Sequence, residues 1–203
     1  MIVIVDYDMG NVGSILNMLR KIGAPATISA DPDRIRAATK LILPGVGAFD
    51  TGMTNLEHSG IRALLEEQVM RKVPVLGVCL GMELLMEGSE EGACPGLGWI
   101  RGRNVRFRYP EGAEQLNVPH MGWNSVRPVA GSRLLATLEP DARFYFVHSY
   151  HVVCDDRADV AGWTQYGYEF ASVVEHGCVM GTQFHPEKSH RFGLALLRTF
   201  AAL

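Results

Sequence analysis

One cysteine lies at the point where the sequence changes from a strand pattern to a helix pattern. The segment Gly77–Gly81, of sequence GVCLG, follows an apolar run and precedes a helix-periodic one. Glycines on both sides of Cys79 permit a tight turn that exposes its sulfur and directs backbone N–H groups toward it. Those amides and the helix dipole favour a thiolate. We therefore predict that Cys79 is a nucleophile. The alternative is a structural thiol, because free cysteines are often buried in cores.

A histidine and a glutamate follow a strand-like run near the end of the chain. His185 and Glu187 stand two residues apart in VMGTQFHPE, and therefore on the same side of an extended chain. Nucleophilic cysteine chemistry needs a base that a third group orients. Taken alone, each has an ordinary alternative, a packed histidine or a solvated surface carboxylate. Together, after a strand, they predict the base and its orienting carboxylate.

A glycine-rich loop follows a third strand-like run, at 40–43. In PGVGAF, Gly45 and Gly47 leave backbone N–H groups available to a developing oxyanion. The alternative is a dinucleotide-binding loop, since these two glycines match the start of GxGxxG. Asp50 occupies the place of the third glycine, which weakens that alternative.

The elements that must position these residues follow from hydrophobic periodicity. In the first half of the chain, short β-rich runs at 2–5, 41–43 and 75–78 alternate with helical patterns at 15–22 and 61–69. This alternation predicts βαβ units and a parallel sheet. Ligands of such sheets bind beyond the carboxyl ends of the strands, where Cys79 falls.

The second half of the chain has a different pattern of apolar segments. From about residue 99, short segments broken by Gly, Pro and Asn predict additional, partly antiparallel strands at 104–107, 144–147, 151–153, 171–174 and 179–184. Residues 194–200 then predict a closing amphipathic helix. No linker or repeat separates two parts, so we expect one domain over 1–203.

Composition excludes several classes of function. A net charge of −3 and a pI near 6.2 give no reason to expect nucleic acid or a membrane surface as a partner. The 4 cysteines are widely separated, without metal-binding or disulfide-scaffold spacing. No apolar run approaches the ~20 residues of a membrane span, and the N-terminal MIVIV is too short for a signal peptide. We expect a cytoplasmic protein without a metal site.

Five motifs together carry a family resemblance. In order, PGVGAF, GVCLGM, PHMGWN, FYFVHSY and QFHPEKS resemble the class I glutamine amidotransferases, and among them the glutaminase subunits of imidazole glycerol phosphate synthase. The resemblance runs nearly end to end. It implies an α/β fold with a flavodoxin-like open sheet, mostly parallel with additional antiparallel strands, and helices on both faces.

The resemblance also implies a chemistry that needs no cofactor. Cys79 would attack the carboxamide of L-glutamine, and His185, oriented by Glu187, would protonate the departing ammonia and later activate water on a glutamyl thioester. The N–H groups of Leu80 and, after a peptide reorientation at Gly45–Val46, of Val46 would bind the oxyanion. By matching positions, the glutamine pocket would be lined by Glu83, Glu91, His148, Ser149 and Tyr150.

The same resemblance implies a protein partner. Family members pass ammonia to a (β/α)8-barrel cyclase subunit, in a heterodimer that serves histidine biosynthesis. By position, the interface would contain Asn11, Trp123, Tyr145 and Lys188. For Trp123 and Tyr145 the alternative is packing in the core.

One position departs from the family pattern GxCxGxQ, in which the final glutamine helps to bind substrate. Here it is Glu83, one helical turn after Cys79. We expect it to point inward, where a carboxylate would oppose thiolate formation and repel the carboxylate of the substrate; the alternatives are that Glu83 is protonated or turned away. Two alternative functions therefore stay open: a paralogue supplying ammonia to another synthetase, for instance one that amidates a sugar for surface polysaccharide, and a non-catalytic docking subunit.

Overall fold

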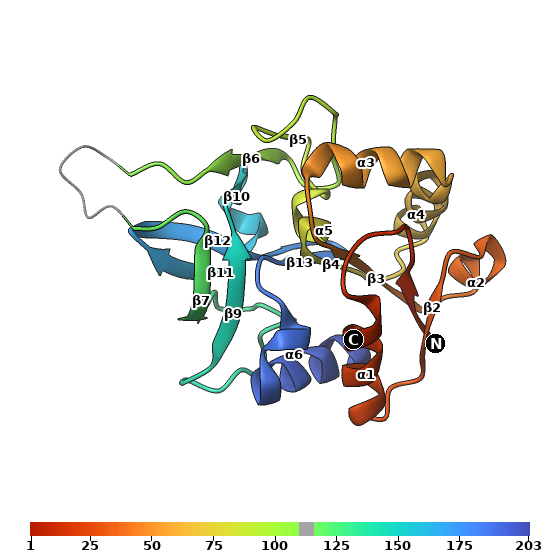
Figure 1. Cartoon of the computed structure of the whole chain (residues 1–203). Helices are drawn as coiled ribbons and strands as arrows, with labels where there is room; N and C mark the ends of the chain where they lie inside the picture. Colours follow the sequence, from red (N-terminus) through yellow and green to blue (C-terminus); the bar gives the residue numbers. More distant parts are fainter. Residues whose placement is uncertain (110–115) are drawn as a thin grey trace.

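The sheet places the carboxyl ends of its parallel strands side by side. The structure, a computed structural model, describes residues 1–109 and 116–203. Its largest sheet has the order β2-β1-β3-β4-β13-β12-β10-β6-β5 (Figure 1). The parallel part consists of β2 (Ala26–Ser29), β1 (Ile2–Val5), β3 (Lys40–Gly45), β4 (Val75–Cys79) and β13 (Val179–Thr182). This 2-1-3-4-5 arrangement is the flavodoxin-like order expected from the resemblance.

Helices cover both faces of the parallel strands (Figure 1). On one face lie α1 (Val12–Lys21) and α6 (His190–Ala202), which pack on Ile2, Ile4 and Ile42. The other face carries α2 (Pro32–Arg36), α3 (Phe49–His58) and α4 (Ile61–Met70) over the alternate residues of the same strands. A strand buried on both faces is apolar at every position, as β1 is.

Antiparallel strands extend the sheet beyond β13. The bounds are β12 (Tyr168–His176), β11 (Val160–Tyr166), β10 (Tyr150–Cys154), β6 (Gly102–Arg106), β5 (Gly88–Ser89) and β8 (Arg127–Pro128), with β5 parallel to β6. A separate two-stranded sheet pairs β7 (His120–Ser125) with β9 (Arg143–His148). The short helices are α5 (Leu80–Glu83), η1 (Arg157–Asp159) and η2 (Pro186–Lys188). The expectation of added antiparallel strands is confirmed.

Two boundaries differ from the sequence prediction at the site itself. The strand expected to end at Leu43 continues through Pro44 to Gly45, because Pro44 and Gly45 still pair with β4. The strand expected over 179–184 ends at Thr182. Gln183 and Phe184 form a bend, and His185 forms an isolated antiparallel bridge with Tyr145. Both shifts lie at the carboxyl edge of the sheet.

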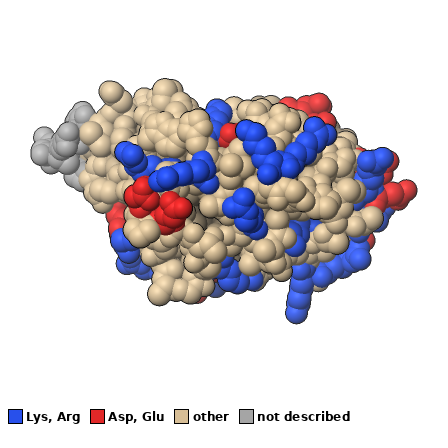
Figure 2. Space-filling view, turned by 90° about the horizontal axis from the view of Figure 1, so that it is seen from below, with Lys and Arg blue, Asp and Glu red and all other residues tan. Residues whose placement is uncertain are grey.

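Charge is distributed unevenly over the surface. Figure 2, seen from below Figure 1, shows Lys and Arg side chains spread across that face, while Asp and Glu form smaller groups. Helix α1 ends with Arg20 and Lys21, and α6 carries Arg191 and Arg198. Within residues 1–109 and 116–203, no helix has the length and apolar character needed to cross a membrane.

Candidate active site

Cys79 occupies a strained turn between β4 and α5. Its φ is +55° and its ψ −112°, in a region that non-glycine residues rarely adopt. The turn is tight because Gly81 lies directly on β3: a Cβ on Gly81 would stand 1.9 Å from the carbonyl oxygen of Leu43, and one on Gly77 2.5 Å from that of Gly81. The strained turn predicted from GVCLG is therefore present.

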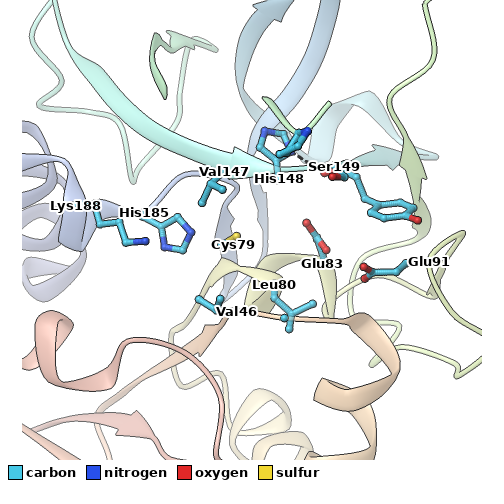
Figure 3. Close-up of a pocket in the computed structure, with 13 residues that line it drawn as sticks. Val46, Cys79, Leu80, Glu83, Glu91, Val147, His148, Ser149, His185 and Lys188 are labelled. Carbon is cyan, nitrogen blue, oxygen red and sulfur yellow. Dashed lines mark hydrogen bonds between the residues drawn. The ribbon is translucent and has the colours of Figure 1, made fainter. Parts of the chain in front are cut away.

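Cys79 opens into a cavity of about 280 Å³ (Figure 3). Most of the site residues predicted from the sequence line it. The lining residues are Val46, Gly47, Cys79, Leu80, Glu83, Glu91, Pro119, Val147, His148, Ser149, Tyr150, His185 and Lys188. In Figure 3 the sulfur lies between His185 on one side and Glu83 on the other. The thiol that we predict to be the nucleophile thus separates a basic side chain from an acidic one.

His185 is held by a carboxylate. Its Nδ1 lies 2.8 Å from Oε1 of Glu187, and both side chains are almost fully buried. A carboxylate oxygen accepts, so Nδ1 carries the hydrogen and Nε2 of the neutral ring has a free lone pair. Nε2 is buried and has no hydrogen-bond partner among the described residues. The pair can accept one proton at Nε2 and return it.

The resting cysteine is a thiol rather than the thiolate expected from its place at a helix start. Burial raises the pKa of Cys79 well above its usual value, and negative charge on Glu83, once that group ionises, and on Glu187 raises it further. The Leu80 N–H and Lys188 act in the opposite direction and are outweighed. Because α5 spans only 4 residues, its dipole is small. The nucleophile must therefore be made by proton transfer to a base.

Glu83 points into the pocket, as expected, and its surroundings favour the alternative that it is protonated. Its Oε1 accepts a 2.7 Å hydrogen bond from Nε2 of Gln183, and no ion pair to Glu83 occurs among the described residues. Burial raises its pKa to about 8; the Gln183 hydrogen bond lowers it and the Glu91 charge raises it. Glu83 is therefore mainly a neutral acid at pH 7, because burial penalises its charge.

Glu91 is anchored at the start of α3. Its Oε2 accepts from the backbone N–H of Phe49 over 2.8 Å. Asp50 in turn accepts from the N–H groups of Ala93 and Cys94, both at 3.0 Å, which ties the loop carrying Glu91 to α3. The two carboxyl groups of Glu83 and Glu91 lie at the same end of the pocket (Figure 3). This end suits a positively charged group.

Residues 148–150 line the pocket on the side across from Val46 and Leu80 (Figure 3). His148 ends β9, Tyr150 starts β10, and Ser149 lies between them. Nδ1 of His148 stands 2.7 Å from the carbonyl oxygen of Tyr150, so it donates. Burial lowers the pKa of His148 well below its usual value, and the ring is neutral.

Backbone groups lie beneath the sulfur. Gly45 pairs with Cys79 across β3 and β4, and a Cβ on Gly45 would stand 2.7 Å from the Gly81 nitrogen. Val46 is 50% exposed at the pocket mouth, and Gly47 has a φ of +121°, which favours glycine. The structure thus brings the predicted oxyanion residues to Cys79.

The predicted interface residues lie in part beside the pocket. The Nζ of Lys188 stands 5.6 Å from the ring centre of Tyr145, and Trp123 packs edge-on against Tyr145 at 6.2 Å. Trp123 is 46% exposed, so the alternative of a core tryptophan is wrong; Tyr145 is half-buried. Asn11 is exposed immediately before α1 and does not line the pocket.

Sequence reasoning missed four residues of the site. Pro119 and Val147 line the pocket, Gln183 holds Glu83, and the hydroxyl of the buried Tyr7 donates to the Pro44 carbonyl. Pro119 and Gln183 fall inside the motifs PHMGWN and QFHPEKS, so their place was a usable signal. Val147 falls inside FYFVHSY and carried the same signal, whereas Tyr7 carried none, since its contact comes only from the fold. Within the described residues, no three His, Cys, Asp or Glu side chains gather as they would around a metal ion.

Comparisons with known proteins agree with this architecture. Residues 3–202 match the family model "Glutamine amidotransferase class-I". The chain is 50% identical over 201 residues to "Imidazole glycerol phosphate synthase subunit HisH 2" of Methanococcus maripaludis, covering 98% of both chains. It is 50% identical to the subunit of the same name of Pseudomonas aeruginosa and 48% to "Imidazole glycerol phosphate synthase subunit HisH" of Bdellovibrio bacteriovorus, each over 204 residues and 100% of both chains.

Two solved structures share the fold at low identity. "Structure of PurLQS from Thermotoga maritima" superposes with a TM-score of 0.74 at 16% identity, covering 99% of this chain and 97% of that one. The glutaminase domain of CTPS from Trypanosoma brucei gives 0.66 at 16% identity, covering 99% and 93%. With a family match over residues 3–202, the chain belongs to the class I glutamine amidotransferases, a family of enzymes.

Proposed function

We propose that this chain is the glutaminase subunit of imidazole glycerol phosphate synthase and acts in the cytoplasm. It hydrolyses L-glutamine to glutamate and ammonia, and delivers the ammonia to a cyclase subunit in histidine biosynthesis. The observation that carries the proposal is the pocket in which the Cys79 thiol lies near a buried His185 held by Glu187. The names of the full-length relatives support the pathway.

The first half of the reaction forms a thioester. Nε2 of His185 takes the proton of the Cys79 thiol, and the sulfur attacks the carboxamide carbon of glutamine. The backbone N–H groups of Leu80 and Val46 bind the oxyanion of the tetrahedral intermediate. Collapse breaks the C–N bond as His185 returns the proton to nitrogen, which leaves as ammonia.

The second half restores the enzyme. His185 takes a proton from water, whose oxygen attacks the thioester carbon. The C–S bond then breaks, the sulfur regains a proton from His185, and glutamate leaves. Glu187 keeps the imidazole in one tautomer and stabilises the imidazolium that forms twice in the cycle. Glu91 receives the ammonium group of the amino acid, and the neutral Glu83 can lie beside the substrate carboxylate without repelling it.

Ammonia must leave without meeting bulk water, because protonation removes its nucleophilicity. We propose that a (β/α)8-barrel cyclase subunit docks over the pocket mouth as the second chain of a heterodimer. The exposed Trp123, with Tyr145 and Lys188 beside it, forms part of the contact surface, and Asn11 contributes from the start of α1.

The decisive variant is Cys79→Ala in the reconstituted complex. We expect it to abolish glutamine-dependent synthesis and to leave synthesis from added ammonium salt intact. The nucleophile belongs to this chain, whereas the acceptor chemistry belongs to the partner. Loss of both activities in a folded, complex-forming variant would refute this division of labour.

A second candidate keeps the glutaminase and changes the acceptor. Two of the relatives carry the numeral 2 in their names, and the opening segment DYDMGNVGS is compatible with a paralogue serving another synthetase. Co-purification of the native partner separates the two: a cyclase barrel supports the first candidate, and a sugar-amidating synthetase supports the second. Glutamate release by the purified complex excludes a docking subunit without catalysis.

A further inference from the structure

A chain of hydrogen bonds leads from strand β7 to the wall of the glutamine pocket. His120 and His148 face each other directly across β7 and β9. Nδ1 of His120 lies 2.9 Å from Nε2 of His148, and Nε2 of His120 lies 3.3 Å from Nδ2 of Asn124. The far end is the 2.7 Å contact of His148 Nδ1 with the Tyr150 carbonyl. The mechanism proposed above uses neither His120 nor Asn124.

The partners fix every hydrogen in this chain. The Tyr150 carbonyl only accepts, so Nδ1 of His148 donates and its Nε2 accepts. Nδ1 of His120 must then donate to His148, which leaves Nε2 of His120 as an acceptor for the Asn124 amide. The Asn124 amide has the matching orientation, because Oδ1 accepts from the Ser125 N–H at 2.8 Å and Nδ2 also donates to the Gln165 carbonyl at 2.9 Å. All polar atoms along the path are satisfied.

The hydrogen bonds from Asn124 through His120 to His148 can form together only while both imidazole rings are neutral. A proton added to Nε2 of His148 would oppose the N–H of His120. Burial prevents this: both histidines are buried, His120 stacks between Tyr166 at 3.9 Å and Phe146 at 4.7 Å, and burial lowers its pKa to about 4. The aromatic sandwich also fixes the plane of the His120 ring.

With both nitrogens occupied, the His148 ring has no free N–H for a substrate. Its effect falls on the backbone that it holds, because Ser149 and Tyr150 line the pocket. We propose that His120 and Asn124 are positioning residues. Through His148 they hold the backbone at Ser149–Tyr150 in the place that glutamine binding requires. This inference rests on the proposed glutaminase function.

Two substitutions of one residue separate hydrogen bonding from packing. His120→Asn places its amide nitrogen near the former Nδ1 and keeps the donor to His148. His120→Gln places its amide near the former Nε2 and loses that donor, although glutamine is closer to histidine in volume. We expect His120→Gln to raise KM for glutamine about tenfold, the effect of one buried hydrogen bond. The kcat should change less than about twofold, and His120→Asn should stay within about threefold of wild-type KM on the same reasoning.

The assay uses the full chain in its complex with the barrel protein. A purely structural role predicts the reverse order, with His120→Asn the more damaging, and that order would overturn the proposal. Should both His120 variants fail to fold, the half-buried Asn124→Ala provides the test: an unchanged KM would overturn the proposal, and a raised KM would support it. Ser125→Ala, an exposed neighbour on β7, is the control and should match wild type.

The hydrogen-bond chain can also be tested by a measurement that does not depend on glutaminase activity. In ¹⁵N-histidine-labelled wild-type protein, NMR should show both His120 and His148 as neutral Nδ1–H tautomers at pH 7. An Nε2–H tautomer or a charged ring at pH 7 would overturn the hydrogen-bond chain even in an active enzyme. Correct tautomers in a protein that releases no glutamate would instead count against the glutaminase function.

Discussion

Gln183 donates its side-chain N–H to Oε1 of Glu83 across 2.7 Å, on the floor of the pocket that holds Cys79. Both side chains are buried, and burial raises the pKa of Glu83 to about 8. A protonated glutamic acid has nearly the shape of glutamine, with one acceptor and one donor at its tip. At pH 7, Glu83 therefore imitates the residue that the family pattern has at this position.

The rate of glutamine hydrolysis should report the proton on Glu83. Below pH 8 the group is neutral, and above pH 8 it ionises beside Cys79 and the substrate carboxylate. We expect kcat/KM of wild type and Glu83→Gln to agree within about twofold at pH 7, and the variant to exceed wild type increasingly above pH 8. The measurement is the ratio of the two kcat/KM values from about pH 6 to about pH 9.5, in which titrations common to both proteins cancel. A ratio that is flat with pH contradicts this assignment.

The same substitution should stabilise the fold, by an amount that depends on pH. The pKa of Glu83 is about 8 in the folded chain and 4.5 when unperturbed, so the folded state holds the proton more tightly. Below pH 4.5, Glu83 is protonated in both the folded and the unfolded chain and does not destabilise the fold. As pH rises from 4.5 toward 8, the unfolded chain loses this proton while the folded chain keeps it, so the wild type loses stability. Glu83→Gln should therefore gain over wild type between these values, by at most about 5 kcal/mol.

Urea unfolding at pH 4.5, 7 and 9 measures that gain. Glu139→Gln, at a site whose side chain is 58% exposed, is the matched control and should show a difference that barely changes over this range. A Glu83→Gln gain that shrinks with rising pH would contradict the sign of the shift.

Glu187 should matter for turnover more than for binding. Glu187→Gln keeps the size of the side chain and removes the charge that stabilises imidazolium at His185. We expect kcat to fall roughly 100-fold while KM for glutamine changes little, since the residue does not line the pocket. Steady-state kinetics provides both numbers, and an unaltered kcat would remove Glu187 from the proposed mechanism.

Docking of the partner should switch the glutaminase on. Val46 and Gly47 stand at the pocket mouth. Gly47 has a φ of +121°, and because glycine adopts both signs of φ at little cost, the backbone of this segment can reorient. We expect slow hydrolysis by the isolated chain and acceleration when the barrel protein binds its own ligand, because the Val46 N–H then completes the oxyanion site. Glutamate release, measured with and without the liganded partner, tests this; equal rates exclude the switch.

Gly81→Ala should break the turn at the nucleophile. The new Cβ would stand 1.9 Å from the Leu43 carbonyl oxygen, and both atoms are fixed to backbone that cannot move apart cheaply. We expect a loss of at least about 3 kcal/mol in the free energy of unfolding. Gly13→Ala is the control, since a Cβ added there would meet nothing within 4 Å and α1 favours alanine. Thermal unfolding of the two variants provides the comparison.

Sequence patterns predict most of the parallel core and the corner that holds Cys79. Strands such as β1 and β4 are apolar at nearly every position, and helices such as α4 have a clear apolar face, so periodicity identifies them. It misses β2, α2, α3, β5, β7, β8 and β11. Helix α3 begins inside the glycine-rich motif and contains Gly52 and Asn55, which carry a weak helical signal, and β7 alternates around Gly122 and Asn124.

Protonation states lie beyond the sequence for a physical reason. Neighbours along the chain predict charges for Cys79 and Glu83, whereas burial is the largest cause of both pKa shifts. Burial is a property of the assembled sheet. The His120–His148 pair is hidden in the same way, because the two residues are far apart in sequence and meet only through strand register.

The backbone of His185, the proposed base, is hydrogen-bonded to the two-stranded sheet of β7 and β9. The His185 N–H donates to the Tyr145 carbonyl at 2.9 Å, the Tyr145 N–H donates to Oγ of Ser189 at 3.0 Å, and that hydroxyl donates to the His185 carbonyl at 2.6 Å. Trp123 lies opposite Tyr145 in β7, with its side chain on the exposed face. The backbone of His185 therefore follows the position of β9, so a change in the pairing of β7 and β9 would displace the imidazole without any contact to the bound amino acid.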